Sequence, residues 1–181
     1  MLIMVIGGAA SGKSDFAENL CMKLSSKPKC YAATMQFNSH DSEAVARIER
    51  HRNARAEHGF DTKEVPTELF KADFSGYDTV LLECLGNLLA NEMFSVRQSA
   101  KDAETAVKNG IAKLAGAVAN VIIVTNNIFS DGEDYSPETM QYIEALGRIS
   151  VWLAGIADEA YEVVCGIPLK LGNKQMQPVV R

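Results

Sequence analysis

Two groups of residues in this sequence have the types and spacing needed for chemistry on a phosphorylated ligand. The first is "GGAASGKS" at 7–14, a full match to G-x-x-x-x-G-K-[ST] directly after an apolar run. In that pattern, backbone N–H groups surround phosphate oxygens. The second is "ARIERHRNAR" at 46–55, where Arg47, His51 and Arg55 recur every four residues. Both patterns predict a site for an anion, and the first predicts a nucleotide phosphate.

Each residue type in the first motif has a physical reason to be there. Glycines let the backbone curl tightly, so that successive N–H groups point inward. Lys13 can reach the β- and γ-phosphates, Ser14 can bind Mg²⁺, and the following helix presents its positive N-terminal end. We therefore expect Lys13 to be catalytic and the whole loop to bind nucleotide. The loop residues are Gly7, Gly8, Ala9, Ala10, Ser11, Gly12, Lys13 and Ser14.

A carboxylate at the end of another apolar run could complete the metal site. Glu83 ends "TVLLE" at 79–83. In P-loop proteins, an acidic residue at the tip of a neighbouring parallel strand helps to organise Mg²⁺. We expect Glu83 to have that role beside Ser14. The alternative is a strand-end carboxylate that simply faces water.

The histidine and arginines at 46–55 allow two interpretations. On a helix, residues four apart share one face, so Arg47, His51 and Arg55 would form a cationic stripe. Neighbouring glutamates could neutralise the stripe and leave an ordinary solvated helix. Alternatively, like charge lowers the pKa of His51 and keeps the imidazole neutral and nucleophilic, while the arginines hold phosphate oxygens. His58 would share this face if the helix continued that far.

The pattern of apolar residues predicts the elements that position these groups. Continuous apolar runs predict strands at 2–7, 30–34, 79–84, 121–126 and 161–166, and 61–66 predicts an edge strand. Helical periodicity predicts helices over 13–24, 42–57, 86–118 and 137–157, the last with Ser136 as its N-cap. The alternation predicts an α/β fold of the P-loop NTPase type, a mostly parallel sheet covered by helices on both faces. Ligands in such folds bind at the carboxyl ends of the strands.

Length and composition narrow the classes of protein. The 181 residues suit a single nucleotide-binding domain over 1–181, with 47% apolar and 23% charged residues. A net charge of −5 argues against broad binding to nucleic acid or an anionic membrane. The apolar run at the N-terminus is too short for a signal sequence or a membrane span. Four widely spaced cysteines (Cys21, Cys30, Cys84 and Cys165) predict buried, reduced thiols and a cytoplasmic protein.

The sequence as a whole resembles a known family. Segments along nearly the whole chain carry the resemblance: "GGAASGKS" (7–14), "YAATMQ" (31–36), "RIERHRNAR" (47–55), "TKEVP" (62–66), "LLECLGNLLAN" (81–91), "VIIVTNN" (121–127) and "ADEAYEVVCGIPLKLG" (157–172). Together they resemble the bifunctional adenosylcobinamide kinase/adenosylcobinamide-phosphate guanylyltransferase family of cobalamin biosynthesis. The combination of a P-loop with R-I-x-x-H-R-x-x-R is far more specific than either part.

The resemblance implies a two-step activity with Mg²⁺. A nucleoside triphosphate (GTP or ATP) phosphorylates adenosylcobinamide, GTP then transfers GMP to His51, and the GMP passes to the new phosphate to give adenosylcobinamide-GDP. It also implies a homo-oligomer with nucleotide sites near subunit boundaries. The implied nucleotide contacts outside the P-loop are Thr34, Met35, Gln36, Arg52, Asn53, Ala54, Arg55, Glu64 and Glu83.

The chain departs from the family pattern at several positions that the resemblance links to phosphate or corrinoid contacts. Ala10 stands where the family often has Arg, and Asn127 where Glu is common. Ser150 and Val151 replace a typical Asn and Gln. Two other functions fit the residues alone. One is a P-loop kinase of another small alcohol, with a merely structural His51, and the other is a non-catalytic GTP-binding regulatory module.

Overall fold

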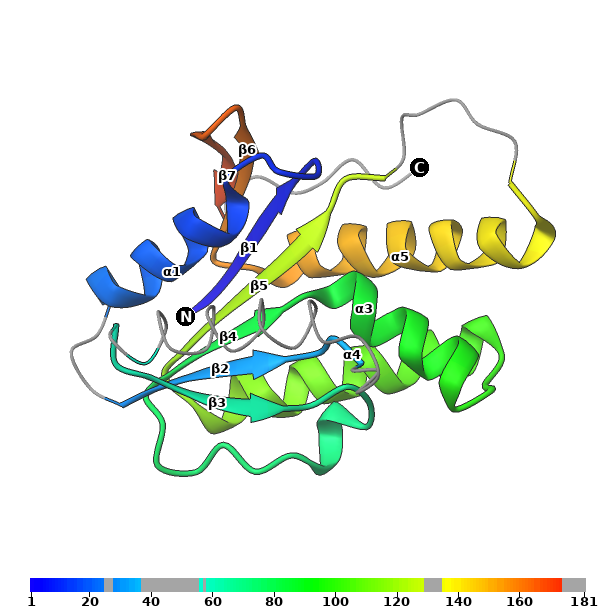
Figure 1. Cartoon of the computed structure of the whole chain (residues 1–181), viewed down its shortest axis with the longest axis horizontal. Coiled ribbons are helices and arrows are strands. Elements are labelled where there is room, and N and C mark those ends of the chain that lie inside the picture. Colours follow the sequence, from blue (N-terminus) through cyan, green and yellow to red (C-terminus); the bar gives the residue numbers. More distant parts are fainter. Residues whose placement is uncertain (25–27, 37–55, 57, 129–134, 174–181) are drawn as a thin grey trace, which may run out of the picture.

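A computed structural model describes residues 1–24, 28–36, 56, 58–128 and 135–173. They build a seven-stranded sheet in the order β3-β2-β4-β5-β1-β6-β7, with helices on both faces (Figure 1). The six strands from β3 to β6 run parallel, and β7 pairs antiparallel with β6. The predicted fold class, a mostly parallel sheet covered by helices, is therefore confirmed.

The strands lie close to the predicted ranges. Their bounds are β1 Leu2–Gly7, β2 Lys29–Ala33, β3 Phe60–Glu64, β4 Thr79–Glu83, β5 Asn120–Asn126, β6 Glu159–Val164 and β7 Ile167–Asn173. The central strands are buried along nearly their whole length, as expected for parallel strands covered on both sides. The expected edge strand near 61–66 is β3, at one end of the sheet.

Helices connect and cover these strands. Their bounds are α1 Lys13–Leu24, η1 Leu69–Lys71, α3 Leu85–Ala90, η2 Asn91–Ser95, α4 Ala100–Ala117 and α5 Pro137–Ile156, where η1 is a 3₁₀ turn and η2 a π-helix. The predicted cap of α5 is confirmed, because the Ser136 hydroxyl accepts from the N–H of Thr139 at 3.3 Å. None of the helices within the described ranges is long and apolar enough to cross a membrane.

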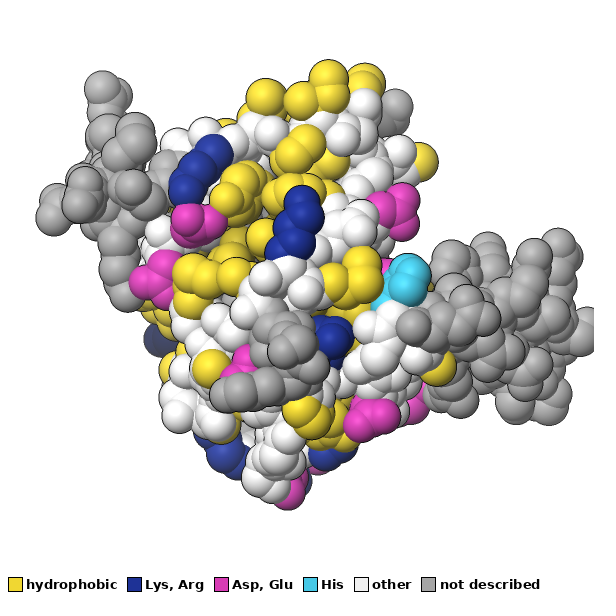
Figure 2. Space-filling model, turned by 90° about the vertical axis from the view of Figure 1, so that its left-hand side faces the viewer, with side chains coloured by type: hydrophobic (Ala, Val, Ile, Leu, Met, Phe, Trp, Pro, Cys, Tyr) yellow, Lys and Arg dark blue, Asp and Glu magenta, His cyan; other side chains and the backbone are white. Residues whose placement is uncertain are grey.

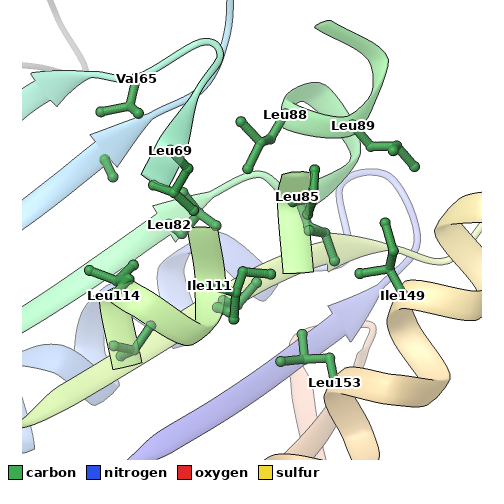
Figure 3. Close-up of a cluster of buried hydrophobic side chains, with 14 of the residues drawn as sticks. Val65, Leu69, Leu82, Leu85, Leu88, Leu89, Ile111, Leu114, Ile149 and Leu153 are labelled. Carbon is green, nitrogen blue, oxygen red and sulfur yellow. The ribbon is translucent and has the colours of Figure 1, made fainter. Parts of the chain in front are cut away.

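Alternating strand residues form two cores. Ile3, Val5 and Leu81 face α1 on one side of the sheet. The larger core lies on the other side, where strand residues such as Leu82 meet Leu85 of α3, Ile111 of α4 and Ile149 of α5 (Figure 3). Fully burying one such aliphatic side chain contributes about 1.5–3 kcal/mol. The two cores therefore anchor both faces of the sheet to its helices.

The prediction of one helix over 86–118 is wrong, because the chain breaks between two helices. Arg97 has a φ of 58°, a left-handed conformation that no α-helix continues through. Ser99 then caps a new helix, α4, by accepting from the N–H of Asp102 at 3.2 Å. The left-handed residue and the new N-cap divide the segment into separate helices, although its apolar pattern alone predicts one continuous helix.

The predicted strand at 161–166 ends early, at Val164. Cys165 and Gly166, with φ values of 50° and 79°, make a two-residue turn of the kind that joins antiparallel strands. β7 follows, a strand that the sequence interpretation missed.

All four cysteines are free thiols and three are buried, but Cys165 is exposed in the turn between β6 and β7, which corrects the prediction that it is buried. Burial raises the pKa of the Cys21 thiol to about 12.

Most of the predicted helix over 42–57 lies outside the described residues, including Arg47 and His51. Ala56 is helical, but His58 and Gly59 form a turn in which Gly59 has a φ of 76°. His58 therefore does not continue a helical face. Its Nδ1 lies 3.7 Å from Oε2 of Glu18, on α1.

Candidate nucleotide site

The phosphate-binding motif forms the loop between β1 and α1, as predicted. The N–H of Ser11 donates to the carbonyl of Gly8 at 3.3 Å, and that of Phe16 donates to Gly12 at 3.0 Å, which begins the helix. Ala10 and Gly12 have φ values of 53° and 86°. A Cβ added to Gly8 would meet no described atom within 4 Å, so the space beside this residue is open. The loop therefore has the curled backbone that the motif predicts.

β6 and the turn that follows it lie so close to this loop that two of its positions have no room for a side chain. A Cβ on Gly7 would lie 2.7 Å from the carbonyl oxygen of Val163 in β6. A Cβ on Gly12 would lie 3.3 Å from Cα of Gly166, whose N–H donates to the carbonyl of Ser11 at 2.8 Å. The β6–β7 turn thus supports the loop, a contact that the sequence interpretation missed. The β7 strand that produces the turn had not been predicted.

Lys13 lies inside the loop rather than beside it. Its side chain is buried, and Nζ donates to the carbonyl of Gly8 at 3.1 Å. A buried ammonium group needs a partner because desolvation otherwise costs several kcal/mol. The lysine therefore lies against the loop backbone, and its ammonium group has further protons that a phosphate could accept.

Ser14 and Glu83 come together where the loop meets the sheet. The Ser14 hydroxyl donates to Oε1 of Glu83, and the Tyr31 hydroxyl donates to Oε2 of Glu83 at 3.0 Å. The strand that carries Glu83, β4, is not a direct neighbour of β1, because β5 lies between them. The prediction of a neighbouring strand is therefore wrong in detail. Ser14 still reaches Glu83, because α1 packs across β5 onto β4.

These oxygen atoms suit Mg²⁺. That ion prefers oxygen donors and is usually held by one or two protein groups together with substrate phosphates. Ser14 and Glu83 provide a hydroxyl and a carboxylate in direct contact. Among the described residues, no group of three or more His, Cys, Asp or Glu side chains is arranged to hold a metal on its own. The donor set therefore fits a cation that arrives with a nucleotide.

Thr34 ties the ends of β2 and β4 together. Its fully buried hydroxyl accepts from the N–H of Cys84 at 2.7 Å and donates to the carbonyl of the same residue at 2.9 Å. Its own N–H donates to the carbonyl of Glu83 at 3.0 Å. The described contacts give the Thr34 side chain a structural role beside Glu83. The Thr34 side chain has no exposed surface with which to make the predicted contact with nucleotide.

The other expected contacts outside the loop are split between described and undescribed residues. Met35 and Gln36 are exposed, and Oε1 of Gln36 accepts from the hydroxyl of Ser95 at 2.8 Å. Glu64 ends β3, where strand register aligns it with Ala33 and Ala33 with Glu83 along one edge of the sheet. His51, Arg52, Asn53, Ala54 and Arg55 lie outside the described residues.

The positions that depart from the family pattern have different surroundings. Asn127 donates its backbone N–H to the carbonyl of Gly7 at 3.0 Å, a contact that any residue except proline could make. Ser150 is buried on α5, whereas Val151 faces outward and is exposed. Ser150 therefore presents no open surface to a ligand.

Comparison with known proteins identifies relatives along nearly the whole chain. The model of the cobinamide kinase / cobinamide phosphate guanyltransferase family matches residues 3–171. The bifunctional adenosylcobalamin biosynthesis protein CobU of Escherichia coli is 34% identical, with 94% of this chain and 99% of that protein aligned. The protein of the same name from Salmonella typhimurium is 33% identical over the same shares. CobP of Pseudomonas aeruginosa, also named as bifunctional, is 27% identical over 96% of this chain and 98% of its own length.

Solved structures with a similar course of the chain are more distant. The flagellar accessory protein FlaH of Methanocaldococcus jannaschii has a TM-score of 0.47 at 13% identity and covers 96% of this chain and 79% of its own. The RadB recombinase has a TM-score of 0.44 at 17% identity, over 89% and 73%. At these scores the fold assignment rests on the strand order and the loop, not on the likeness.

Proposed function

This chain belongs to the cobinamide kinase / cobinamide phosphate guanyltransferase family, and from that premise we propose how its two reactions are divided between the P-loop and His51. It is a bifunctional enzyme of adenosylcobalamin biosynthesis, with a kinase and a nucleotidyltransferase activity. The family description includes both activities. It therefore favours this function over a kinase of another alcohol or a regulatory GTP-binding module.

The contact between Ser14 and Glu83 beside the P-loop is the observation that supports the kinase half. We assign Lys13 and the loop N–H groups to hold the phosphates of GTP or ATP, with the N-terminus of α1 adding positive potential. The hydroxyl oxygen of the corrinoid substrate then attacks the γ-phosphorus, and a new O–P bond forms as the bond to the β,γ-bridging oxygen breaks. The nucleoside diphosphate leaves, and the hydroxyl proton is released to solvent. Mg²⁺, held by Ser14 and Glu83, would neutralise charge on the transferred group.

The guanylyltransferase half is assigned to His51 on the sequence pattern. A neutral ring nitrogen of His51 attacks the α-phosphorus of GTP, an N–P bond forms, and pyrophosphate leaves. The phosphate on cobinamide then attacks the same phosphorus and the histidine leaves, which gives adenosylcobinamide-GDP. Arginine suits the flanking positions because its planar group binds phosphate oxygens in pairs. The proposed nucleotide contacts for this half are Met35, Gln36, Arg52, Asn53, Ala54, Arg55 and Glu64.

We also propose that the chain forms a homo-oligomer. Ile167, Leu169 and Leu171 alternate along β7 and are 62%, 49% and 50% exposed. Figure 2 shows apolar side chains gathered at the top of the face it presents, at the height of β6 and β7. In the described sheet β7 has one neighbouring strand, so its outer edge carries unpaired backbone groups, a common site of association. The cytoplasm is the proposed location, in keeping with four free thiols.

Conversion of adenosylcobinamide tests the proposed function as a whole. The purified chain is incubated with adenosylcobinamide, Mg²⁺ and either ATP plus GTP or GTP alone, and products are identified by mass. We expect adenosylcobinamide phosphate first and adenosylcobinamide-GDP next. Formation of the phosphate without any GDP product would leave a kinase alone. The absence of both products would refute the proposed division of the two reactions.

A further inference from the structure

Tyr31 is a buried tyrosine whose polar end meets the carboxylate of the candidate metal site. It lies in β2 and is 7% exposed, and its hydroxyl donates to Oε2 of Glu83 at 3.0 Å. The other carboxylate oxygen, Oε1, accepts from Ser14. Both oxygens of Glu83 therefore have a fixed hydroxyl neighbour, one from β2 and one from α1.

Strand register explains how Tyr31 reaches this carboxylate. Ala33 of β2 lies opposite Glu83 of β4, and Tyr31 lies opposite Leu81, two residues earlier. Residues two apart in a strand share a face, and their side chains lean along the strand. The small side chain of Ala33 leaves room beside Glu83, so the long phenol can extend past it to the carboxylate.

Packing alone does not require the hydroxyl group. The Tyr31 ring belongs to the core that also contains Phe60, Leu81 and Ala17, where a phenylalanine ring would fill the same space. A buried phenol needs hydrogen-bond partners, and the Tyr31 hydroxyl donates to the carboxylate of the candidate metal site. The ring of Tyr31 therefore contributes to the core, whereas its hydroxyl contributes to the orientation of Glu83.

We propose that Tyr31 is a positioning residue that fixes the Glu83 carboxylate for the cation that accompanies the nucleotide. The proposal rests on the proposed function of the P-loop site. The Ser14 hydroxyl can offer a lone pair to a cation and still donate its proton to Oε1 of Glu83. The bond from Tyr31 holds the other oxygen, Oε2, so the two hydroxyls together fix the orientation of the carboxylate. Loss of hydrogen bonds that orient a metal ligand typically weakens metal affinity about 10–100-fold.

The variant Tyr31→Phe tests this proposal in the full-length chain. Mn²⁺ binding is measured directly by electron paramagnetic resonance in the presence of GDP, and GDP binding is measured separately in EDTA. We expect Mn²⁺ affinity to fall about tenfold, while GDP affinity without metal stays within twofold. The Mg²⁺ concentration that gives half-maximal phosphorylation of cobinamide should rise by a similar factor.

Tyr161→Phe is the matched control. The Tyr161 hydroxyl also donates to a carboxylate, Oε2 of Glu159 at 2.6 Å, but that pair lies within β6. We expect Mn²⁺ affinity in Tyr161→Phe to stay within twofold of the wild type. An equal loss in both variants would mean a general effect of removing a phenol and would overturn the proposal.

Further outcomes separate positioning from packing. If Tyr31→Phe binds Mn²⁺ like the wild type and only melts at a lower temperature, Tyr31 is a packing residue and the proposal is wrong. In a Glu83→Asp background the carboxylate is one methylene shorter, so adding Tyr31→Phe should change Mn²⁺ affinity less than twofold. A full tenfold loss there would also contradict the proposal. The Mn²⁺ measurement does not need corrinoid, so its result is independent of whether the wild type makes adenosylcobinamide-GDP.

Discussion

Replacement of Thr34 by valine would separate a structural role from a ligand contact. Valine has nearly the same shape but no hydroxyl, so the N–H and carbonyl of Cys84 would lose bonds of 2.7 Å and 2.9 Å. Each buried polar group left without a partner costs about 1–3 kcal/mol. For the pair we expect the free energy of unfolding to fall by about 2–4 kcal/mol. In a chain of this size, that lowers Tm by about 5–15 °C.

Two assays distinguish the roles of Thr34. Thermal unfolding followed by circular dichroism gives the change in Tm, and calorimetric titration well below the transition gives the affinity for GTP. Thr34→Ser is the control, because it keeps the hydroxyl and loses a methyl group, and it should retain most of the stability. We expect GTP affinity in Thr34→Val to change less than threefold. A Tm within about 1 °C of the wild type together with a tenfold weaker GTP affinity would refute the structural role.

Three other substitutions test the loop and the metal site. Lys13→Ala should slow phosphorylation about 10²–10³-fold, because it removes a charge that stabilises the transition state, while Tm changes little; turnover at the wild-type rate in a cobinamide phosphorylation assay would contradict the assignment. Glu83→Gln should slow Mg²⁺-dependent turnover about 10²-fold or more and leave metal-free nucleotide affinity nearly unchanged; an unaltered Mg²⁺ titration would reduce Glu83 to a strand-end carboxylate. Gly7→Ala should destabilise the fold by about 1–3 kcal/mol, since its Cβ would lie 2.7 Å from a carbonyl oxygen of β6, and urea unfolding would measure the loss.

The phosphate-binding loop and the two elements that flank it, β1 and α1, could be predicted from the sequence almost to the residue. The ranges predicted for β1 and α1 match the structure, because an apolar run, a glycine-rich motif and an amphipathic segment follow one another without a gap. The contact between Ser14 and Glu83 could also be anticipated, since the motif names one partner and a strand-end carboxylate suggests the other. Patterns made of consecutive residues fix the bounds of these elements without any knowledge of the rest of the fold.

Contacts that depend on strand order could not be predicted in the same way. The meeting of Tyr31 with Glu83 depends on the register of β2 against β4, which are far apart in the sequence. The support that Gly166 gives to the loop depends on β6 lying next to β1. Apolar periodicity identifies strands but does not say which strands are neighbours or how they are aligned.

Boundaries were missed where a single residue changes the backbone direction. Arg97 and Cys165 both adopt a positive φ, and neither is glycine or asparagine, so composition gave no signal. The glycine at 166 and the alternation of Ile167, Leu169 and Leu171 did signal a hairpin. The hairpin was nevertheless missed, because the residue pattern of β6 changes little up to the turn and gives no clear end to the strand.

Formation of a covalent guanylylated enzyme is the most direct test of the central claim, that one chain joins a P-loop kinase to a histidine nucleotidyl carrier. The protein is incubated with GTP labelled at the α-phosphate and Mg²⁺, denatured, and measured by intact mass, and the adduct is mapped by peptide mass. We predict one GMP on His51, labile in acid and stable in base as a phosphoramidate is, and no adduct in His51→Asn, which should still phosphorylate cobinamide. The claim would be contradicted by no adduct in the wild type, an adduct that persists in His51→Asn, or a label that maps to His58 or Lys13.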